Sequence, residues 1–168
     1  MRSERLRYRP VEPGDLDVYH RLVQDEHVRR YMMDGHVHPR EWAAERIRES
    51  QALFDRRGVG TWLVYDKATG ELVGFCGFEH SSRTPEPQLA YAMLERFTRR
   101  GFATEMARAA IAEARTRPGF EEIVADVDEI NTGSVRVLEK VGFERVEVQP
   151  GAFGNVFVLR LPAAKPTG

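Results

Sequence analysis

Hydrophobic and polar positions in the first third of the chain predict one strand followed by two helices. Apolar and polar residues alternate over Arg5–Arg9, as in a short strand with one covered face. Apolar residues then recur at helical spacing after the turn Pro13–Asp15 and from Pro39 to near Gly58, with the polar loop Met33–His36 between them. The residues expected on the buried faces of these helices are Leu16, Tyr19, Leu22 and Val23, then Ala43, Ile47 and Phe54.

The middle of the chain predicts a hairpin and one further strand. Thr61–Tyr65 and Leu72–Phe78 are both strand-like, and the turn sequence Asp66–Gly70 joins them. A polar loop over Ser81–Pro87 follows the hairpin, and Gln88–Leu94 is the next strand-like segment.

The second half predicts a strand–helix–strand unit, then a helix and a final hairpin. Apolar residues follow helical spacing from Gly101 to Ala114, and Ile123–Val127 is nearly all apolar, as in a strand covered on both faces. A strand, a helix and a second strand in this order form a crossover, which places Gln88–Leu94 and Ile123–Val127 parallel. The remaining predicted elements are a helix over Asn131–Val141, capped by Gly142, and strands over Phe143–Val148 and Asn155–Leu161.

The element order β-α-α-β-β-β-α-β-α-β-β predicts an α/β fold with a mixed sheet and helices on both faces. The 168 residues suit one domain, expected over residues 1–162, and residues 163–168 are expected to be a disordered tail.

Composition and charge exclude several classes of protein. A single cysteine, Cys76, rules out a disulfide framework and a thiolate metal cluster and favours a reducing cytoplasm. The five histidines, among them His36 and His38, do not form a metal-ligand pattern, so no metal is expected. A formal net charge of −1 does not suit a nucleic-acid-binding protein, and no apolar run is long enough to span a bilayer. We therefore expect neither nucleic acid nor membrane as a partner.

Candidate chemistry begins at Arg99-Arg100-Gly101, directly before a predicted helix. The first turn of a helix has unpaired backbone N–H groups and a partial positive charge, so it can bind a phosphate. Glycine lets the oxygens approach the backbone, the arginines could add charge, and Ala103 keeps a second position small. The alternative interpretation is that Gly101 only turns the chain and both arginines are solvated.

Two segments together resemble a known family. RGFATEMARAAIAEA begins at Arg100 and DVDEINTGSVRVLEKVGF begins at Asp126. They are similar to the acetyl-CoA loop and the asparagine–serine segment of the GNAT superfamily of acetyl-CoA-dependent N-acetyltransferases. The closest likeness is to the RimJ/RimL-type branch, which acetylates the N-termini of ribosomal proteins. This resemblance implies a mostly antiparallel sheet with a central parallel strand–helix–strand unit.

The resemblance also implies where acetyl-CoA, the acetyl donor, would bind. The pantetheine arm would pair with backbone groups near Met93 and Leu94, and Asn131 would hold this arm or an ordered water. The pyrophosphate would lie on the amides of Arg99, Arg100, Gly101, Phe102, Ala103 and Thr104. The chain departs from the family pattern before the central glycine, where Thr98 and Arg99 stand in place of the usual glutamine or arginine and glycine.

Catalytic roles follow from the same resemblance. Ser134 would give a proton or a hydrogen bond to the leaving thiolate. The family commonly has a strand glutamate three residues before a tyrosine, but here Gln88 precedes Tyr91, and an amide cannot act as a general base. Glu147 is the first candidate for the base, and Glu79 and Glu86 are weaker candidates. The alternatives are that Asn131 and Ser134 only cap a helix, that Glu147 is solvated and that Tyr91 belongs to the core or the acceptor wall.

The expected reaction is direct attack of a primary amine on the thioester, with no enzyme nucleophile and no metal. A protein N-terminal α-amine is the first expectation for the acceptor, and a small-molecule amine such as an antibiotic or a polyamine is the alternative. A non-catalytic acyl-CoA-binding module is a further alternative, because Gln88 replaces the glutamate. The protein is expected to be a monomer or a homodimer.

Overall fold

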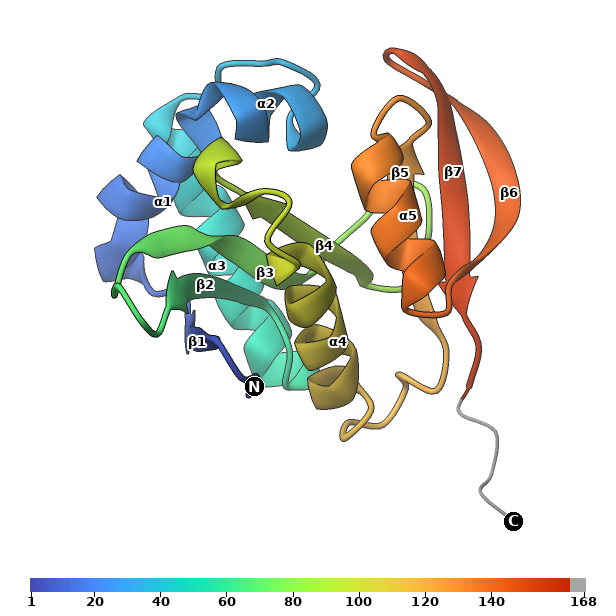
Figure 1. Ribbon diagram of the computed structural model, residues 1–168, viewed down its shortest axis with the longest axis horizontal. Coiled ribbons are helices and arrows are strands. Elements are labelled where there is room, and N and C mark those ends of the chain that lie inside the picture. The colour runs from blue at the N-terminus through green and yellow to red at the C-terminus, as the bar shows by residue number, and fades with distance from the viewer. Residues whose placement is uncertain (164–168) are drawn as a thin grey trace.

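A seven-stranded sheet in the order β1-β2-β3-β4-β5-β7-β6 forms the centre of the protein (Figure 1). The computed structural model describes residues 1–163. All neighbouring strands run antiparallel except β4 and β5, which are parallel, so the mixed and mostly antiparallel sheet is confirmed. The strands are β1 (Leu6–Pro10), β2 (Thr61–Asp66), β3 (Leu72–Glu79), β4 (Gln88–Met93), β5 (Ile123–Asp128), β6 (Glu144–Gly151) and β7 (Gly154–Leu161).

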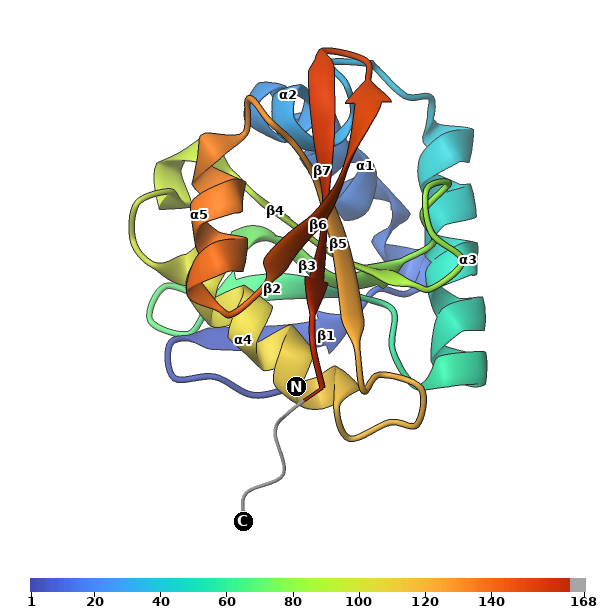
Figure 2. The same cartoon turned by 90° about the vertical axis from the view of Figure 1, so that its right-hand side faces the viewer.

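Helices cover both faces of this sheet, as the sequence predicts (Figure 2). The α-helices are α1 (Leu16–Gln24), α2 (Glu26–Met32), α3 (Arg40–Arg57), α4 (Phe102–Ala114) and α5 (Thr132–Lys140), with short 3₁₀ turns at Pro13–Asp15 and Glu95–Phe97. One core lies under α4 and α5 and includes Phe102, Met106 and Leu138. The other lies under α1, α2 and α3, where Tyr19 and Ile47 are buried.

The segment after α1 differs from the prediction, because it contains the separate helix α2. Asp25 ends α1 in an extended conformation, and its carboxylate accepts hydrogen bonds from the N–H groups of His27 and Val28. This N-cap starts a new helix one residue after the previous one ends. The side chain of α3 that reaches the core is also different from the prediction, since Leu53 is 2% exposed whereas the adjacent Phe54 is only partly buried.

The parallel pairing in the middle of the sheet is short. Among the described residues, the register of β4 and β5 is confined to Gln88 opposite Val124, at the start of both strands. The strands separate beyond this pair, and α4 and α5 follow their far ends (Figure 1). Backbone groups at the diverging edges can therefore bind a ligand in place of a neighbouring strand.

A close backbone contact holds β3 against β4 beside this divergence. Gly74 lies opposite Met93, and a Cβ atom at position 74 would stand 2.0 Å from the carbonyl oxygen of Ala92. The next amide along, that of Leu94, donates to the Val73 carbonyl at 2.9 Å. Only glycine permits β4 to end this close to β3.

We predict that Gly74→Ala destabilises the protein by roughly 1–3 kcal/mol, the usual cost of forced overpacking. The new methyl group must displace the backbone at Ala92. Chemical denaturation measures the change in unfolding free energy. Gly14→Ala is the matched control, because its Cβ would meet nothing within 4 Å. Equal stability of the two variants would contradict this account.

Candidate active site

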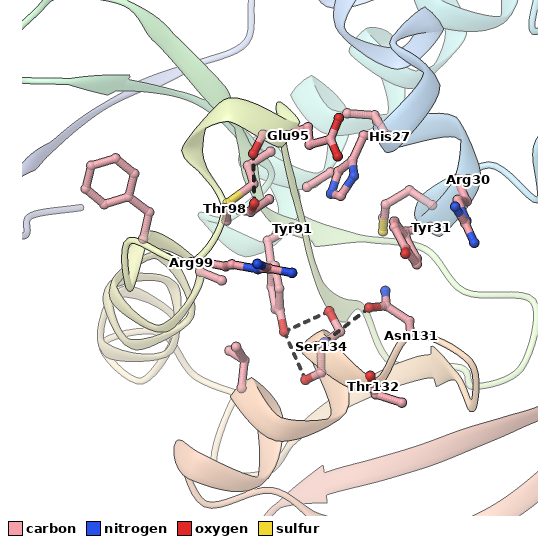
Figure 3. Close-up of a pocket in the computed structure, with 18 of the residues that line it drawn as sticks. His27, Arg30, Tyr31, Tyr91, Glu95, Thr98, Arg99, Asn131, Thr132 and Ser134 are labelled. Carbon is pink, nitrogen blue, oxygen red and sulfur yellow. Dashed lines mark hydrogen bonds between the residues drawn. The ribbon is translucent and has the colours of Figure 1, made fainter.

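A cavity of about 790 Å³ opens where β4 and β5 diverge. Its walls come from the end of β4, the loop and first turn of α4, the first turn of α5, and α2 (Figure 3). Helix α2, which the sequence did not predict, supplies His27, Arg30 and Tyr31 to this wall. The cavity is thus bordered by the two helix N-termini that the sequence singled out.

The loop before α4 has the backbone geometry of an anion-binding turn. Gly101 is the N-cap of α4 at φ 80°, and no side-chain hydrogen bond caps this end of the helix within the described chain. Arg99 also has a positive φ, 60°, which is uncommon for a residue with a side chain. The family glycine is therefore replaced by an arginine held in the conformation that glycine prefers. Gly101, Phe102, Ala103 and Thr104 line the cavity, so the first-turn amides are available to an oxyanion.

Arg5 on the segment before β1 holds this loop from outside. Its guanidinium donates to the Arg100 carbonyl at 2.9 Å and to the Glu105 carboxylate at 2.8 Å, and its backbone N–H donates to Glu105 at 2.7 Å. It also stacks on Phe102, 4.7 Å from the ring centroid. Burial opposes ionisation of Glu105, but hydrogen bonds from Arg5 and Ser3 hold the pKa of this carboxyl below its ordinary value. Arg5 therefore fixes the loop and balances a negative charge in the first turns of α4.

The side chain of Arg100 points away from the cavity. It lies 3.4 Å from the buried Asp66 carboxylate and packs over Phe97 and Phe102. Arg100 is therefore not among the residues that line the cavity, whereas Arg99 is. Arg9 on β1 is also paired, because its guanidinium lies 2.6 Å from the Asp15 carboxylate.

A hydroxyl pair lies between the two strands at the bottom of the cavity. Ser134 Oγ donates to the hydroxyl of Tyr91 at 3.1 Å, and that hydroxyl donates to the Ser134 carbonyl at 3.4 Å (Figure 3). Burial raises the pKa of Tyr91 to about 12, so the phenol is protonated near neutral pH. Asn131 Oδ1 accepts from the Ser134 N–H at 3.2 Å, so the predicted capping bond is present. The cap uses the Ser134 backbone N–H, whereas the Ser134 hydroxyl is bonded to Tyr91.

A second cavity, of about 530 Å³, lies on the other side of this hydroxyl pair. Tyr91, Asn131 and Ser134 line both cavities, together with Tyr31 and Met32. The second cavity adds polar side chains from β3, β4 and β5, which the sequence did not bring together, namely Glu79, Gln88, Asp126 and Asp128. Trp42 lines it as well.

The structure does not bring every predicted site residue to a cavity. Met93 and Asn131 line the first cavity, but Leu94 does not, and its N–H is bound to Val73. Glu147 is exposed on the edge strand β6, where it accepts from Gln149 at 2.9 Å, and it lines neither cavity among the described residues. Glu79, which the sequence made a weaker candidate for the base than Glu147, lines the second cavity.

The described residues contain neither a cluster of metal ligands nor a membrane-spanning helix. Among residues 1–163, no group of three or more His, Cys, Asp or Glu side chains could hold a metal ion. His38 instead stacks on Trp42, with ring centroids 4.1 Å apart. No helix of this part of the chain has the length and apolarity required to cross a bilayer.

A family comparison identifies the class of protein that this fold and these cavities define. The model of the acetyltransferase (GNAT) domain matches residues 5–144. The chain belongs to this family and is an acetyl-CoA-dependent N-acetyltransferase, with acetyl-CoA as the donor. Among curated proteins, YkkB of Bacillus subtilis (strain 168), an uncharacterised protein, is 29% identical over 145 residues, which is 83% of this chain and 82% of YkkB.

Solved structures share the fold at lower sequence identity. A GNAT-family acetyltransferase from Bordetella pertussis superposes with a TM-score of 0.82 at 22% identity, over 95% of this chain and 97% of that one. RimL, a ribosomal α-N-protein acetyltransferase solved with coenzyme A, gives 0.75 at 17% identity, over 94% of each chain. A spermidine N-acetyltransferase chimera, from Vibrio cholerae and human sequences, gives 0.74 at 18%, over 95% of this chain and 96% of that one. These similarities support the fold and do not single out one branch.

We predict that Arg5→Gln raises the KM for acetyl-CoA about five-fold, because loss of a part-exposed ion pair costs roughly 1 kcal/mol. The loop at Gly101 loses its outer support, and Glu105 keeps an unbalanced negative charge near the N-terminus of α4. Arg9→Gln is the matched control, since it breaks an ion pair on β1 that is remote from this loop. Steady-state kinetics would contradict the prediction if both variants had the same KM for acetyl-CoA.

Proposed function

We propose that the protein transfers the acetyl group of acetyl-CoA directly to a primary amine that enters from the second cavity. The observation that carries this proposal is the meeting of two cavities at Tyr91, Asn131 and Ser134. A transferase needs separate access for donor and acceptor and one place where they meet. A binding module for acyl-CoA needs only the first cavity.

In this proposal the cofactor occupies the first cavity. Its diphosphate lies on the first-turn amides of α4 from Phe102 to Thr104, with Gly101 and the backbone of Arg99 beside it. The pantetheine arm lies along the end of β4 near Met93, and a backbone N–H there stabilises the oxyanion that forms on the thioester. Arg100 contributes through its backbone, because its side chain is bound to Asp66.

Ser134 supplies the hydrogen bond to the leaving thiolate, with Tyr91 as its partner. The two hydroxyls are 3.1 Å apart, and the raised pKa of Tyr91 keeps a proton on the pair. When Ser134 gives its proton to the thiolate, Tyr91 can replace it. Support for this role is the position of both hydroxyls on the boundary between the cavities.

The α-amine of a peptide or protein N-terminus is our first proposal for the acceptor. Its pKa is roughly 7.7–8.0, against about 10.4 for an alkylamine, so more of it is neutral near pH 7 and ready to attack. A small-molecule amine such as a polyamine or an antibiotic is the alternative. The matching structures include both a RimL and a spermidine N-acetyltransferase, at similar TM-scores. The RimJ/RimL branch, the cytoplasmic location, the single domain and the monomeric or dimeric state stay predictions.

An acceptor panel tests the proposed reaction. Release of the CoA thiol is measured with peptides that have free N-termini, the same peptides with blocked N-termini and internal lysines, diamines and aminoglycosides. Turnover on the free N-termini alone supports the first proposal, and turnover on the small amines alone supports the alternative. Tight binding of CoA without turnover on any acceptor would overturn the transferase in favour of the binding module.

We predict that Ser134→Ala lowers kcat about 100-fold, at the low end of the usual effect of an acid catalyst, with little change in the affinity for CoA. Alanine keeps the backbone N–H that Asn131 caps, so the helix start is preserved. Tyr91→Phe should lower kcat less, because Ser134 retains its own proton. Unchanged turnover in Ser134→Ala, measured at saturating acetyl-CoA, would leave only the capping role.

A further inference from the structure

We propose that Glu79, at the end of β3, is the general base that takes the proton from the acceptor amine. This assignment rests on the proposed transfer reaction and places the base at Glu79, a weaker candidate from the sequence, rather than at Glu147. The strand position where the family commonly has a glutamate is Gln88, and Glu79 is its direct partner in the β3–β4 register. In this chain the carboxylate is therefore on β3 instead of β4, and it lines the second cavity.

Position in the cavity is the first support for Glu79. It lines the same 530 Å³ cavity as Tyr91 and Ser134, which mark the boundary with the cofactor cavity. An amine that enters the second cavity thus has a carboxylate on its own side and the hydroxyl pair ahead of it. Glu147 lies on exposed β6 and offers no such path.

Gln88 is the second support. Gln88 is 8% exposed, and its Nε2 lies 3.5 Å from Glu79 Oε1, while Oε1 of Gln88 is buried without a hydrogen-bond partner among the described residues. Rotation of the amide by half a turn would bring Oε1 toward Glu79, and a protonated Glu79 could then donate to it. An amide next to a carboxyl can in this way satisfy both protonation states.

The surroundings of Glu79 place its proton exchange near neutral pH. Burial raises its pKa to about 7, the hydrogen bond from Gln88 opposes the rise, and the nearby Asp126 carboxylate adds to it. On α3, the charge of Arg46 lowers the pKa of Glu79 and the charge of Glu49 raises it. The other charged or titratable residues that line the cavities around Glu79 are Tyr19, Tyr31, Asp34, His80, Arg83, Tyr91 and Asp128. Arg83 lies 3.6 Å from the Asp126 carboxylate.

Each proton has a defined place in the reaction. The Glu79 carboxylate takes one proton from the acceptor ammonium, directly or through a water, and leaves a neutral amine. The amine nitrogen forms a bond to the thioester carbonyl carbon, the carbon–sulfur bond breaks, and the thiolate receives a proton from the Ser134–Tyr91 pair. The nitrogen loses its second proton to that pair, and Glu79 returns its own to solvent. The sum is one amide, one thiol and one released proton.

An α-ammonium transfers its proton to this base more readily than an alkylammonium does, because the pKa of the α-amine is lower. Proton transfer from an α-ammonium to a carboxylate with a pKa of about 7 is unfavourable by roughly one pKa unit, and from a lysine-type ammonium by more than three. Each pKa unit changes the equilibrium constant for this proton transfer, and so the amount of neutral amine formed, by a factor of ten. The assignment therefore agrees with the first proposal for the acceptor.

The test is the pH profile of kcat/KM for Glu79→Gln on the best acceptor from the panel. In the native protein, activity should rise with pH through about 7, because only the ionised carboxylate can accept a proton. Glu79→Gln, which is nearly isosteric, should lower kcat/KM at least 30-fold and abolish the rise near 7, and Glu79→Asp should restore part of it. Glu144→Gln on exposed β6 is the charge-matched control and should behave as the native protein.

Three outcomes of this experiment distinguish a wrong assignment of the base from a wrong proposed function. Loss of the pH-dependent rise in Glu147→Gln and not in Glu79→Gln would overturn the assignment and restore the sequence prediction. An unchanged profile in both variants would overturn it as well, while the transferase stands. Absence of turnover by the native protein on every acceptor overturns the proposed function instead, and the assignment with it.

A second measurement reports protonation without turnover. A carboxyl whose pKa is raised from its ordinary 4.5 to about 7 stabilises the folded state below about 4.5, and this contribution is lost as pH rises through about 7. Thermal unfolding should therefore show a smaller fall in Tm between these pH values for Glu79→Gln than for the native protein. Identical pH dependence of the two proteins would show that folding does not raise the pKa of Glu79, and would contradict a base that titrates near pH 7.

Discussion

The early separation of β4 from β5 is the constraint on which the rest of the site depends. Two parallel strands that stay paired would bury their backbone groups in each other, and no ligand could lie between them. Here the pairing stops at Gln88 and Val124, so the strands diverge toward the helices that follow them. The first cavity, the second cavity and the hydroxyl pair that borders both all lie in or beside this gap.

The gap is kept open by contacts on both sides of it. Glycine at position 74 lets β3 lie against the end of β4, and the Leu94 amide is fixed to β3 rather than to β5. The loop after β4 is held in turn by Arg5, across the sheet edge from the cavity. The site is therefore preorganised by the scaffold, and its open groups face the ligand without a change in the strands.

The sequence predicted the elements with strong periodicity and missed those that depend on tertiary context. The segment from Gly101 to Ala114 and the apolar strand after it were correct because their spacing is unambiguous. Helix α2 was missed, because its seven residues, EHVRRYM, carry few apolar positions and its start depends on the capping bond of Asp25. The roles that the family resemblance implies for the loop before α4 could be assigned only in part. Nothing in the local sequence shows that the Arg100 side chain turns toward Asp66 while Arg99 lines the cavity.

The choice between Glu79 and Glu147 shows why side-chain placement on strands is hard to predict. A shift of one residue in register moves every side chain to the opposite face, and β6 has such an irregularity between Arg145 and Glu147. The pairing of Glu79 with Gln88 also joins residues nine positions apart across a long loop. Neither fact can be read from local alternation.

The contact between Arg5 and Glu105 joins residues that are 100 positions apart in the chain. A ribosome-bound chain cannot form it until the segment that carries α4 has emerged and β1 has reached the sheet, so the loop before α4 is completed late in folding. Coenzyme A binding then stabilises only those molecules in which the N-terminal segment has already packed against α4. Cofactor binding in the cell would serve as a check that the whole polypeptide has folded, and partly folded copies would stay unliganded and open to proteolysis.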